Sequence, residues 1–179
     1  MHYITSYQSP ISALTLLSDG ENLVGLWLVG QKHYGAGLLT NAEQKDDLPV
    51  FEHAKDWLDR YFAGKKPQIA ELPLAPEGSE FRQSVWDILR EIPYGSVMTY
   101  GDIAKRIAVQ TGKTRMSAQA IGGAVGHNPI SIIVPCHRVV GANGNLTGYA
   151  GGLQYKIKLL ELEGVDMGEM FVPKRGTAV

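Results

Sequence analysis

The sequence has little cysteine, no long apolar run and almost no net charge. Its 179 residues include one cysteine, Cys136, which excludes an internal disulfide and a thiol-rich zinc site. No stretch approaches the ~20 apolar residues of a membrane span, so we expect no membrane contact. The first residues lack a basic segment followed by an apolar core, and no secretory signal is expected. A reduced, cytoplasmic setting fits these features best.

Histidine and charge are equally unremarkable in number. The five histidines, at positions 2, 33, 53, 127 and 137, lack the spacing of metal ligands, and we expect no metal and no cofactor. A net charge of −1 argues against a general nucleic-acid binder. The charge is unevenly distributed, with −4 over residues 1–78 and +3 over residues 79–155. A basic half suits phosphate contact, although ordinary solvated faces also produce such a difference.

The N-terminal part of the chain predicts strands followed by a helix. The first 30 residues favour strands and turns, with apolar runs at 11–17 and 23–29 around a turn-forming segment. A helix is expected to begin at Pro49, with Gly64 past its end. Proline and glycine recur over residues 64–79, which indicates a linker. We therefore predict a small α/β scaffold domain, residues 1–78, that includes this linker.

Residues 79–179 predict a second, mostly helical domain. Helices are expected over 79–91, 101–108, 117–125 and 153–162, and a turn near residue 112 joins the second to the third. A strand leading to Cys136 and a glycine-rich hairpin at 141–145 follow the third helix. This order is typical of a winged helix-turn-helix, with the Asn-Gly turn as the wing. The predicted fold class is α/β, an α/β domain followed by a winged helix-turn-helix domain.

Cys136 follows an apolar, β-branched run that ends at Pro135, and His137 comes directly after it. A strand that stops there would present the thiol where side chains meet a ligand. The adjacent imidazole favours the thiolate, which is the nucleophilic form of cysteine. A lone cysteine is also commonly a small buried apolar residue, so position alone leaves both interpretations open.

The expected helix over residues 117–125 is crowded with alanine and glycine. Each interior glycine costs a helix about 1 kcal/mol relative to alanine, so the helix gains from small side chains only where something approaches its backbone closely. A neighbouring helix would be one such partner. DNA would be the other.

The residues around Cys136 resemble the active-site signature of the O6-alkylguanine-DNA alkyltransferase family. The string Pro135-Cys136-His137-Arg138-Val139 carries this likeness, and further blocks that resemble the family occur in order over about half of the chain. These blocks are Phe81-Arg82-Gln83-Ser84-Val85-Trp86, Ile92-Pro93-Tyr94-Gly95, Met98-Thr99-Tyr100-Gly101, Gly122-Gly123-Ala124-Val125-Gly126-His127-Asn128-Pro129, Gly148-Tyr149-Ala150-Gly151-Gly152 and Leu159-Leu160-Glu161-Leu162-Glu163. The resemblance implies a ribonuclease-H-like N-terminal domain.

The resemblance also implies direct-reversal DNA repair. A methyl or other alkyl group would pass from O6 of guanine, or from O4 of thymine, in double-stranded DNA to Cys136. The family's relay of cysteine, histidine, water and glutamate falls here on Cys136, His137 and Glu163, whereas exposure statistics alone would make Glu163 a solvent-facing carboxylate. A thioether does not hydrolyse under mild conditions and no second thiol could resolve it, so each molecule should act once.

The extruded nucleotide of such a reaction needs a pocket. The resemblance places the helix that contains Gly122 in the minor groove, and it makes Tyr100 crowd the phosphate and hydrogen-bond the base. Tyr149 would flank the base, and the N–H of Ala150 would donate to O6. The remaining roles fall on the carbonyls of Cys136 and Val139 as acceptors for the exocyclic amine, on Asn128 as a brace of the active-site loop, and on Arg138 in a structural or phosphate-binding role.

One position departs from the family pattern. Nine residues before Asn128, where many members carry an arginine, this chain has Gln119. A glutamine can fill the gap left by the flipped base but brings no positive charge. We therefore expect Gln119 to intercalate into the base stack, with flipping of the nucleotide somewhat less favourable than with arginine. Arg115 is expected to contact a phosphate. Separately, we expect the protein to be a monomer.

Two other functions compete with repair. A Cys–His hydrolase or acyltransferase would need a base placed across the fold and an oxyanion hole, and ester or amide turnover lost in Cys136→Ser would reveal it. A non-catalytic winged-helix protein would bind lesions without alkyl transfer. Gln119 is the feature that most favours the second.

Overall fold

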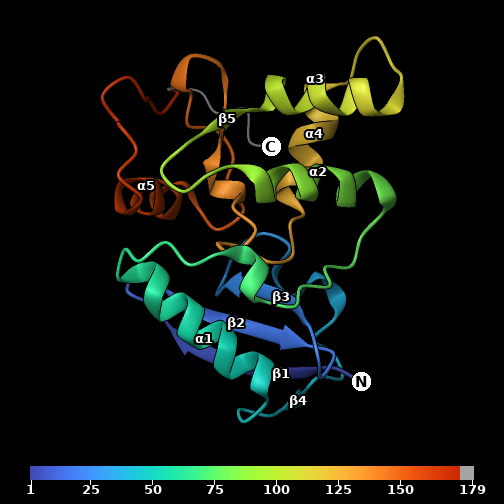
Figure 1. Cartoon of the computed structure of the whole chain (residues 1–179), viewed down its shortest axis with the longest axis vertical. Coiled ribbons are helices and arrows are strands. Elements are labelled where there is room, and N and C mark those ends of the chain that lie inside the picture. Colours follow the sequence, from blue (N-terminus) through green and yellow to red (C-terminus); the bar gives the residue numbers. More distant parts are fainter. Residues whose placement is uncertain (174–179) are drawn as a thin grey trace. The chain divides into compact units, whose positions relative to one another are not determined.

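The computed structural model describes residues 1–173 and forms two compact units (Figure 1). Of the described residues, the first unit comprises 1–77 and 129–133, and the second comprises 78–128 and 134–173. The α/β fold class is confirmed, since a sheet with a helix dominates the first unit and helices dominate the second. Across residues 1–173, no helix combines the length and the apolar character that crossing a membrane requires.

A four-stranded sheet forms the base of the first unit. Strands β1 (Tyr3–Gln8), β2 (Ala13–Ser18), β3 (Leu23–Leu28) and β4 (Glu43–Gln44) take the order β3-β2-β1-β4. The pairs β1–β2 and β2–β3 are antiparallel, whereas β1 and β4 are parallel. The hairpin predicted around residues 18–22 is therefore confirmed. The two-residue strand β4 lies outside the predicted strands, because it is too short to show a pattern.

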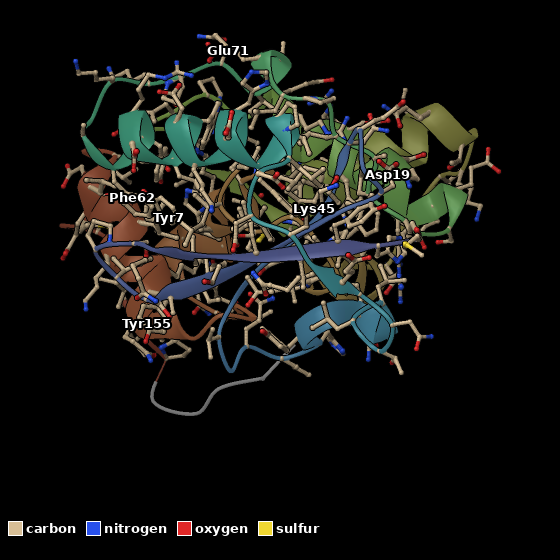
Figure 2. All side chains as sticks on the ribbon, turned by 90° about the horizontal axis from the view of Figure 1, so that it is seen from below. Tyr7, Asp19, Lys45, Phe62, Glu71 and Tyr155 are labelled. Carbon is tan, nitrogen blue, oxygen red and sulfur yellow. The ribbon has the colours of Figure 1, made fainter. Side chains whose placement is uncertain are left out.

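Helix α1 (Pro49–Phe62) covers one face of this sheet (Figure 2). Proline is well placed in the first turn of a helix, where an N–H has no intrahelical partner. The helix buries Phe51, Trp57 and four further side chains. Tyr7 of β1, labelled in Figure 2, donates its hydroxyl to Asp59 of α1 at 2.6 Å.

Two segments outside the sheet pair with β3. The Leu23 N–H donates to the Pro73 carbonyl at 2.8 Å and the Ala75 N–H donates to Leu23 at 2.9 Å. Further along the strand, the Leu26 N–H donates to the Pro129 carbonyl at 2.8 Å. The proline-rich connection predicted as a linker is thus bound to the sheet over residues 73–75, because prolines that cannot donate still offer carbonyls as acceptors.

The second unit contains a helix-turn-helix, as predicted. Its helices are α2 (Glu80–Glu91), α3 (Tyr100–Thr111), α4 (Ala118–Gly126) and α5 (Leu153–Leu162). Strands β5 (Met98–Thr99) and β6 (Val139–Val140) form a parallel pair. Helix α4 packs against both α2 and α3, and α3 ends at Gly112 in a left-handed conformation. The hydroxyls of Ser79, Thr99 and Ser117 cap α2, α3 and α4, which satisfies backbone donors at each start.

The strand expected before Cys136 is absent. Residues 131–133 form a turn, and Cys136 begins a short 3₁₀ helix, Cys136–Arg138. Ile132 has a φ of 70°, which a β-branched residue adopts only when its surroundings hold it there. The prediction was wrong because Ile132 and Ile133 are both buried within a turn. Their burial explains their apolar character, so no strand is needed to account for it.

The predicted wing is a turn without a hairpin. Asn143 and Gly144 both have positive φ, 60° and 82°, and the Asn145 N–H donates to the Ala142 carbonyl at 3.2 Å. These are the features of the Asn-Gly turn that the sequence predicts. Its flanks do not form a two-stranded ladder, because β6 pairs with β5 instead.

Candidate active site

Cys136 lies at the wall of a narrow pocket in the second unit. Its side chain is 5% exposed, and the pocket lining is Tyr100, Gly122, Val125, Gly126, Cys136, Gly148, Tyr149 and Ala150. Burial raises the pKa of the Cys136 thiol, because a low dielectric disfavours the charged form. The resting sulfur is therefore a thiol, and the thiolate that the adjacent imidazole is expected to favour is not the resting form.

Three features oppose this effect of burial. A hydrogen bond with the Asn128 side chain, the positive charge of Lys156 and the backbone N–H groups of residues 136 and 137 each lower the pKa of Cys136. The Asn128 amide also donates to the Val134 carbonyl at 2.8 Å. A thiolate formed in this pocket would therefore find stabilising partners already in place.

His137 and Glu163 form a pair whose side chains are fully buried. The imidazole Nε2 hydrogen-bonds the carboxylate Oε2. Burial lowers the pKa of His137, so the ring is neutral near pH 7. A carboxylate only accepts hydrogen bonds, so Nε2 carries the proton and Nδ1 carries the lone pair. Nδ1 is buried and has no hydrogen-bond partner among the described residues, which leaves it able to accept a proton.

Glu163 is held as an anion at the end of α5. Burial alone would raise the pKa of this carboxyl group, but hydrogen bonds and charge from His137 and Arg138 outweigh it and lower the pKa to about 2. Arg138 Nε donates to Oε1 at 2.7 Å, and the Gly95 N–H donates to the same oxygen at 3.1 Å. The solvent-facing alternative for Glu163 is wrong, because the residue is 5% exposed.

Arg138 is buried, and its contacts favour the structural role of the two considered. Its Nη1 donates to the Ile92 carbonyl at 2.7 Å, and its guanidinium lies 5.7 Å from the centre of the Tyr94 ring. With Nε on Glu163, the side chain joins three parts of the second unit. A guanidinium fixed in this way is not turned toward a phosphate outside the protein.

The hydroxyl of Tyr100 contacts the opposite wall of the pocket. It lies 3.2 Å from the Thr147 carbonyl oxygen and 3.4 Å from that of Gly148. Tyr149 and Ala150 continue this wall. Burial raises the pKa of both tyrosines, so both hydroxyls are neutral. The predicted pocket residues are thus brought together, with Tyr100 bonded to the loop that carries Tyr149.

Lys156 is a site residue that the sequence analysis missed. The side chain is fully buried, and its Nζ donates to the Val139 carbonyl and, at 3.1 Å each, to those of Thr147 and Gly148. Burial lowers its pKa to about 8. A signal was present, because Lys156 stands three residues after Leu153 and four before Leu160, on the inward face of the helix.

The exposed side of the helix-turn-helix carries the two remaining candidates. Gln119 in α4 and Arg115 before it are both exposed, so neither lies with Cys136 in the pocket. A Cβ added at Gly123 or Gly126 would meet no atom within 4 Å. Packing inside the described chain therefore does not require glycine at either position. No group of three His, Cys, Asp or Glu side chains able to hold a metal occurs within residues 1–173.

Comparison with known proteins places this geometry in a family. The model of the 6-O-methylguanine DNA methyltransferase DNA-binding domain matches residues 80–165, and that of the ribonuclease-like domain of the same proteins matches residues 2–76. The chain is 43% identical to a methylated-DNA–protein-cysteine methyltransferase of Haemophilus influenzae, over 90% of this chain and 86% of the relative. It is 46% identical to a protein of the same name from Methanosarcina acetivorans, over 90% and 98%.

A solved structure agrees with these sequence relatives. The Mycobacterium tuberculosis OGT in complex with DNA is 42% identical and superposes with a TM-score of 0.77, covering 90% of this chain and 92% of that one. The matched models together span nearly the whole chain, and the buried Cys136, His137 and Glu163 lie within the DNA-binding match. The chain therefore belongs to the 6-O-methylguanine DNA methyltransferase family.

Proposed function

We propose that this protein repairs DNA by direct reversal, moving an alkyl group from O6 of guanine irreversibly to Cys136. The observation that carries the proposal is the buried His137–Glu163 pair beside a thiol at the wall of a pocket. The names of its relatives give the same activity to proteins that share nearly the whole chain.

The proposed chemistry is an in-line displacement at carbon. The Cys136 proton passes through a water to Nδ1 of His137, and Glu163 stabilises the imidazolium that results. The sulfur then forms a bond to the alkyl carbon while the bond from that carbon to O6 breaks. Guanine leaves as its O6 anion or takes a proton, and the thioether remains on the protein because no second cysteine is present to resolve it.

Selection of the base would rest on the pocket walls. The Ala150 N–H would donate to O6 and favour guanine as leaving group, and it would serve O4 of thymine in the same way. The carbonyls of Cys136 and Val139 would accept from the exocyclic amine of guanine, which adenine lacks. Tyr149 would flank the base, Tyr100 would crowd the adjacent phosphate, and Asn128 would brace the loop before Cys136.

Double-stranded DNA would dock on the exposed side of the helix-turn-helix. No described side chain or backbone atom fills the space next to Gly123 and Gly126, which supports the close approach of DNA to α4 at these positions. A helix with small side chains is slender enough to enter the minor groove. Gln119 would fill the gap in the stack, and Arg115 would contact a phosphate. The related OGT was crystallised with DNA.

The remaining parts of the proposal concern the cellular compartment, the oligomeric state and the roles of the two domains. A cysteine that must stay reduced until it meets a lesion suits the cytoplasm. One site per chain and no need for a second subunit suit a monomer. We assign residues 1–78 the role of scaffold and residues 79–179 the DNA-binding and transfer role.

Mass spectrometry tests the proposed function directly. The protein is mixed with an excess of duplex oligonucleotide containing O6-methylguanine, and the expected result is one methyl group per chain, on Cys136, with one equivalent of lesion consumed. Cys136→Ser should bind the duplex and remove nothing. Sustained turnover would contradict the single-use mechanism, and binding without any mass increase would identify the protein as the non-catalytic lesion binder.

A further inference from the structure

The chain after α5 returns to the Asn-Gly turn and pairs with it. Residues 165–171, here called the C-terminal segment, run back from the end of α5 to the loop around residue 144 (red and orange in Figure 1). The Phe171 N–H donates to the Gly144 carbonyl at 3.1 Å, and the Leu146 N–H donates to the Phe171 carbonyl at 2.8 Å. These two bonds fix the register of the segment against the turn.

Side chains support the same contact. Val140, Leu146 and Leu160 form a buried cluster, and Val165, Met167 and Met170 of the C-terminal segment pack against it while partly exposed. Burying this apolar surface stabilises the turn against the end of α5. The segment is therefore part of the packed second unit and not a loose extension of it.

The closeness of the contact is visible at Gly144. A Cβ added there would lie 2.8 Å from the Glu169 carbonyl oxygen and 3.3 Å from the Met170 Cα. The residue also has a φ of +82°, which side-chain-bearing residues rarely adopt. Glycine at this position thus serves both the turn and the passage of the C-terminal segment across it.

The clamped turn leads directly into the pocket. Leu146 is followed by Thr147, whose carbonyl accepts from Tyr100 and Lys156, and then by the pocket residues Gly148, Tyr149 and Ala150. The loop 147–150 therefore has two supports, the Tyr100 and Lys156 bonds along its length and the C-terminal segment at its start. Among the hydrogen bonds of residues 1–173, none joins the segment to the side chain of Cys136 or of His137.

We infer that the C-terminal segment is a positioning element that holds the 147–150 wall of the pocket in place for the substrate base. The inference rests on the proposed function and deepens it. Loosening the segment should weaken the binding of the base and leave the reactivity of the thiol unchanged, because the wall moves and the nucleophile does not.

Phe171→Pro tests this inference in the full chain, because proline removes the N–H that donates to Gly144. Two variants are the controls. Phe171→Ala keeps the backbone N–H of residue 171. Val172→Pro introduces a proline one residue later, where the backbone N–H donates no backbone hydrogen bond within residues 1–173. The probe is free O6-benzylguanine, and the benzyl-transfer rate is measured against its concentration. We expect the half-saturating concentration to rise about 3- to 10-fold in Phe171→Pro, the effect of one lost hydrogen bond, with the limiting rate retained. Phe171→Ala and Val172→Pro should stay close to wild type.

A second readout separates positioning from general damage. The rate at which iodoacetamide modifies Cys136 as a function of pH should be the same in Phe171→Pro and wild type. Gly144→Ala disturbs the contact from its other side and should reproduce the weaker binding if Phe171→Pro fails to fold. Unchanged half-saturation in both variants, or an equal loss of thiol reactivity, would overturn the inference. If the wild type transfers no benzyl group from the free base, the same variants are compared on duplex containing O6-methylguanine, and failure of the wild type to take methyl from that duplex would remove the proposed function and this inference with it.

Discussion

Lys156 is the residue whose environment is most unusual for its type. Its buried ammonium donates to three carbonyls, those of Val139, Thr147 and Gly148. It joins the loop at 147–148 to Val139 and places a positive charge where it lowers the pKa of Cys136. Carbonyls left without a donor in a buried site each cost about 1–3 kcal/mol. Removing the ammonium should therefore raise the pKa of Cys136 and leave buried carbonyls without donors.

Lys156→Met keeps the carbon chain and removes the ammonium. We expect methyl transfer from a duplex to slow by about tenfold or more, the effect of a thiol pKa raised by one pH unit. The pH profile of iodoacetamide modification should move to higher pH with it. Lys158→Met, on the exposed side of the same helix, is the matched control. A profile identical to wild type would show that the charge of Lys156 does not act on the thiol.

Gln119→Arg tests the departure from the family pattern. An arginine at this exposed position of α4 should tighten binding to duplex carrying the lesion, because it adds positive charge near the phosphates. Gln154→Arg, an exposed position of α5, adds the same charge elsewhere. Affinity is measured by fluorescence anisotropy at two salt concentrations. Equal binding and equal repair rates for Gln119→Arg and wild type would reject an intercalating role for Gln119.

The candidate site could be proposed from the sequence because its residues are neighbours or belong to a recognisable block. Cys136 and His137 are adjacent in the sequence. Glu163 was proposed only because of the family resemblance, since exposure statistics for glutamate predict a solvent-facing side chain. Lys156 was missed because lysine is so rarely buried that this general expectation outweighed the signal of its place on the apolar face of α5. The resting protonation of Cys136 could not be predicted either, since burial is a property of the whole fold.

Helix α4 contains glycines that lower the stability of the helix but would allow DNA to approach its backbone closely. Gly123 is partly exposed, and an added Cβ there would touch nothing within 4 Å. Gly123→Ala should therefore stabilise the protein by up to about 1 kcal/mol, measured by urea unfolding. If α4 enters a DNA groove, the same methyl group should weaken duplex binding. A variant that is more stable and binds DNA equally well would show that DNA does not approach Gly123.

Elements with a strong period or clear end signals were predictable, and those defined by tertiary contact were not. The helices with hydroxyl caps and the β2–β3 hairpin were found, because their signals are local. The strand before Cys136 was wrong, since buried isoleucines in a turn carry the same apolar pattern as a strand. The pairing of the C-terminal segment with the Asn-Gly turn has no local signal at all.

At the scale of the whole molecule, the buried charges make stability depend on pH. The pKa of Glu163 is about 2 in the folded chain against 4.5 for an ordinary glutamate, so its contribution is complete above pH 4.5 and is lost as the pH falls toward 2. That contribution is on the order of 3 kcal/mol. His137, whose pKa is lowered by burial, acts in the same direction, since the unfolded chain takes up its proton first.

Glu163→Gln should remove most of this dependence. Urea unfolding between pH 7 and pH 3 should show a steep loss of stability in the wild type and a flatter curve in the variant. At pH 7 the variant should be less stable by about 3–5 kcal/mol, because Arg138 keeps its buried charge without the carboxylate. Parallel curves would mean that other carboxylates dominate acid unfolding.

The near-complete burial of Cys136 has a consequence for the lifetime of a molecule that can be used only once. Peroxides and soluble electrophiles react with thiolates far faster than with thiols, and here the sulfur is protonated and almost completely buried. Such reagents should therefore modify each copy only slowly, so that its one reaction stays available for a damaged base.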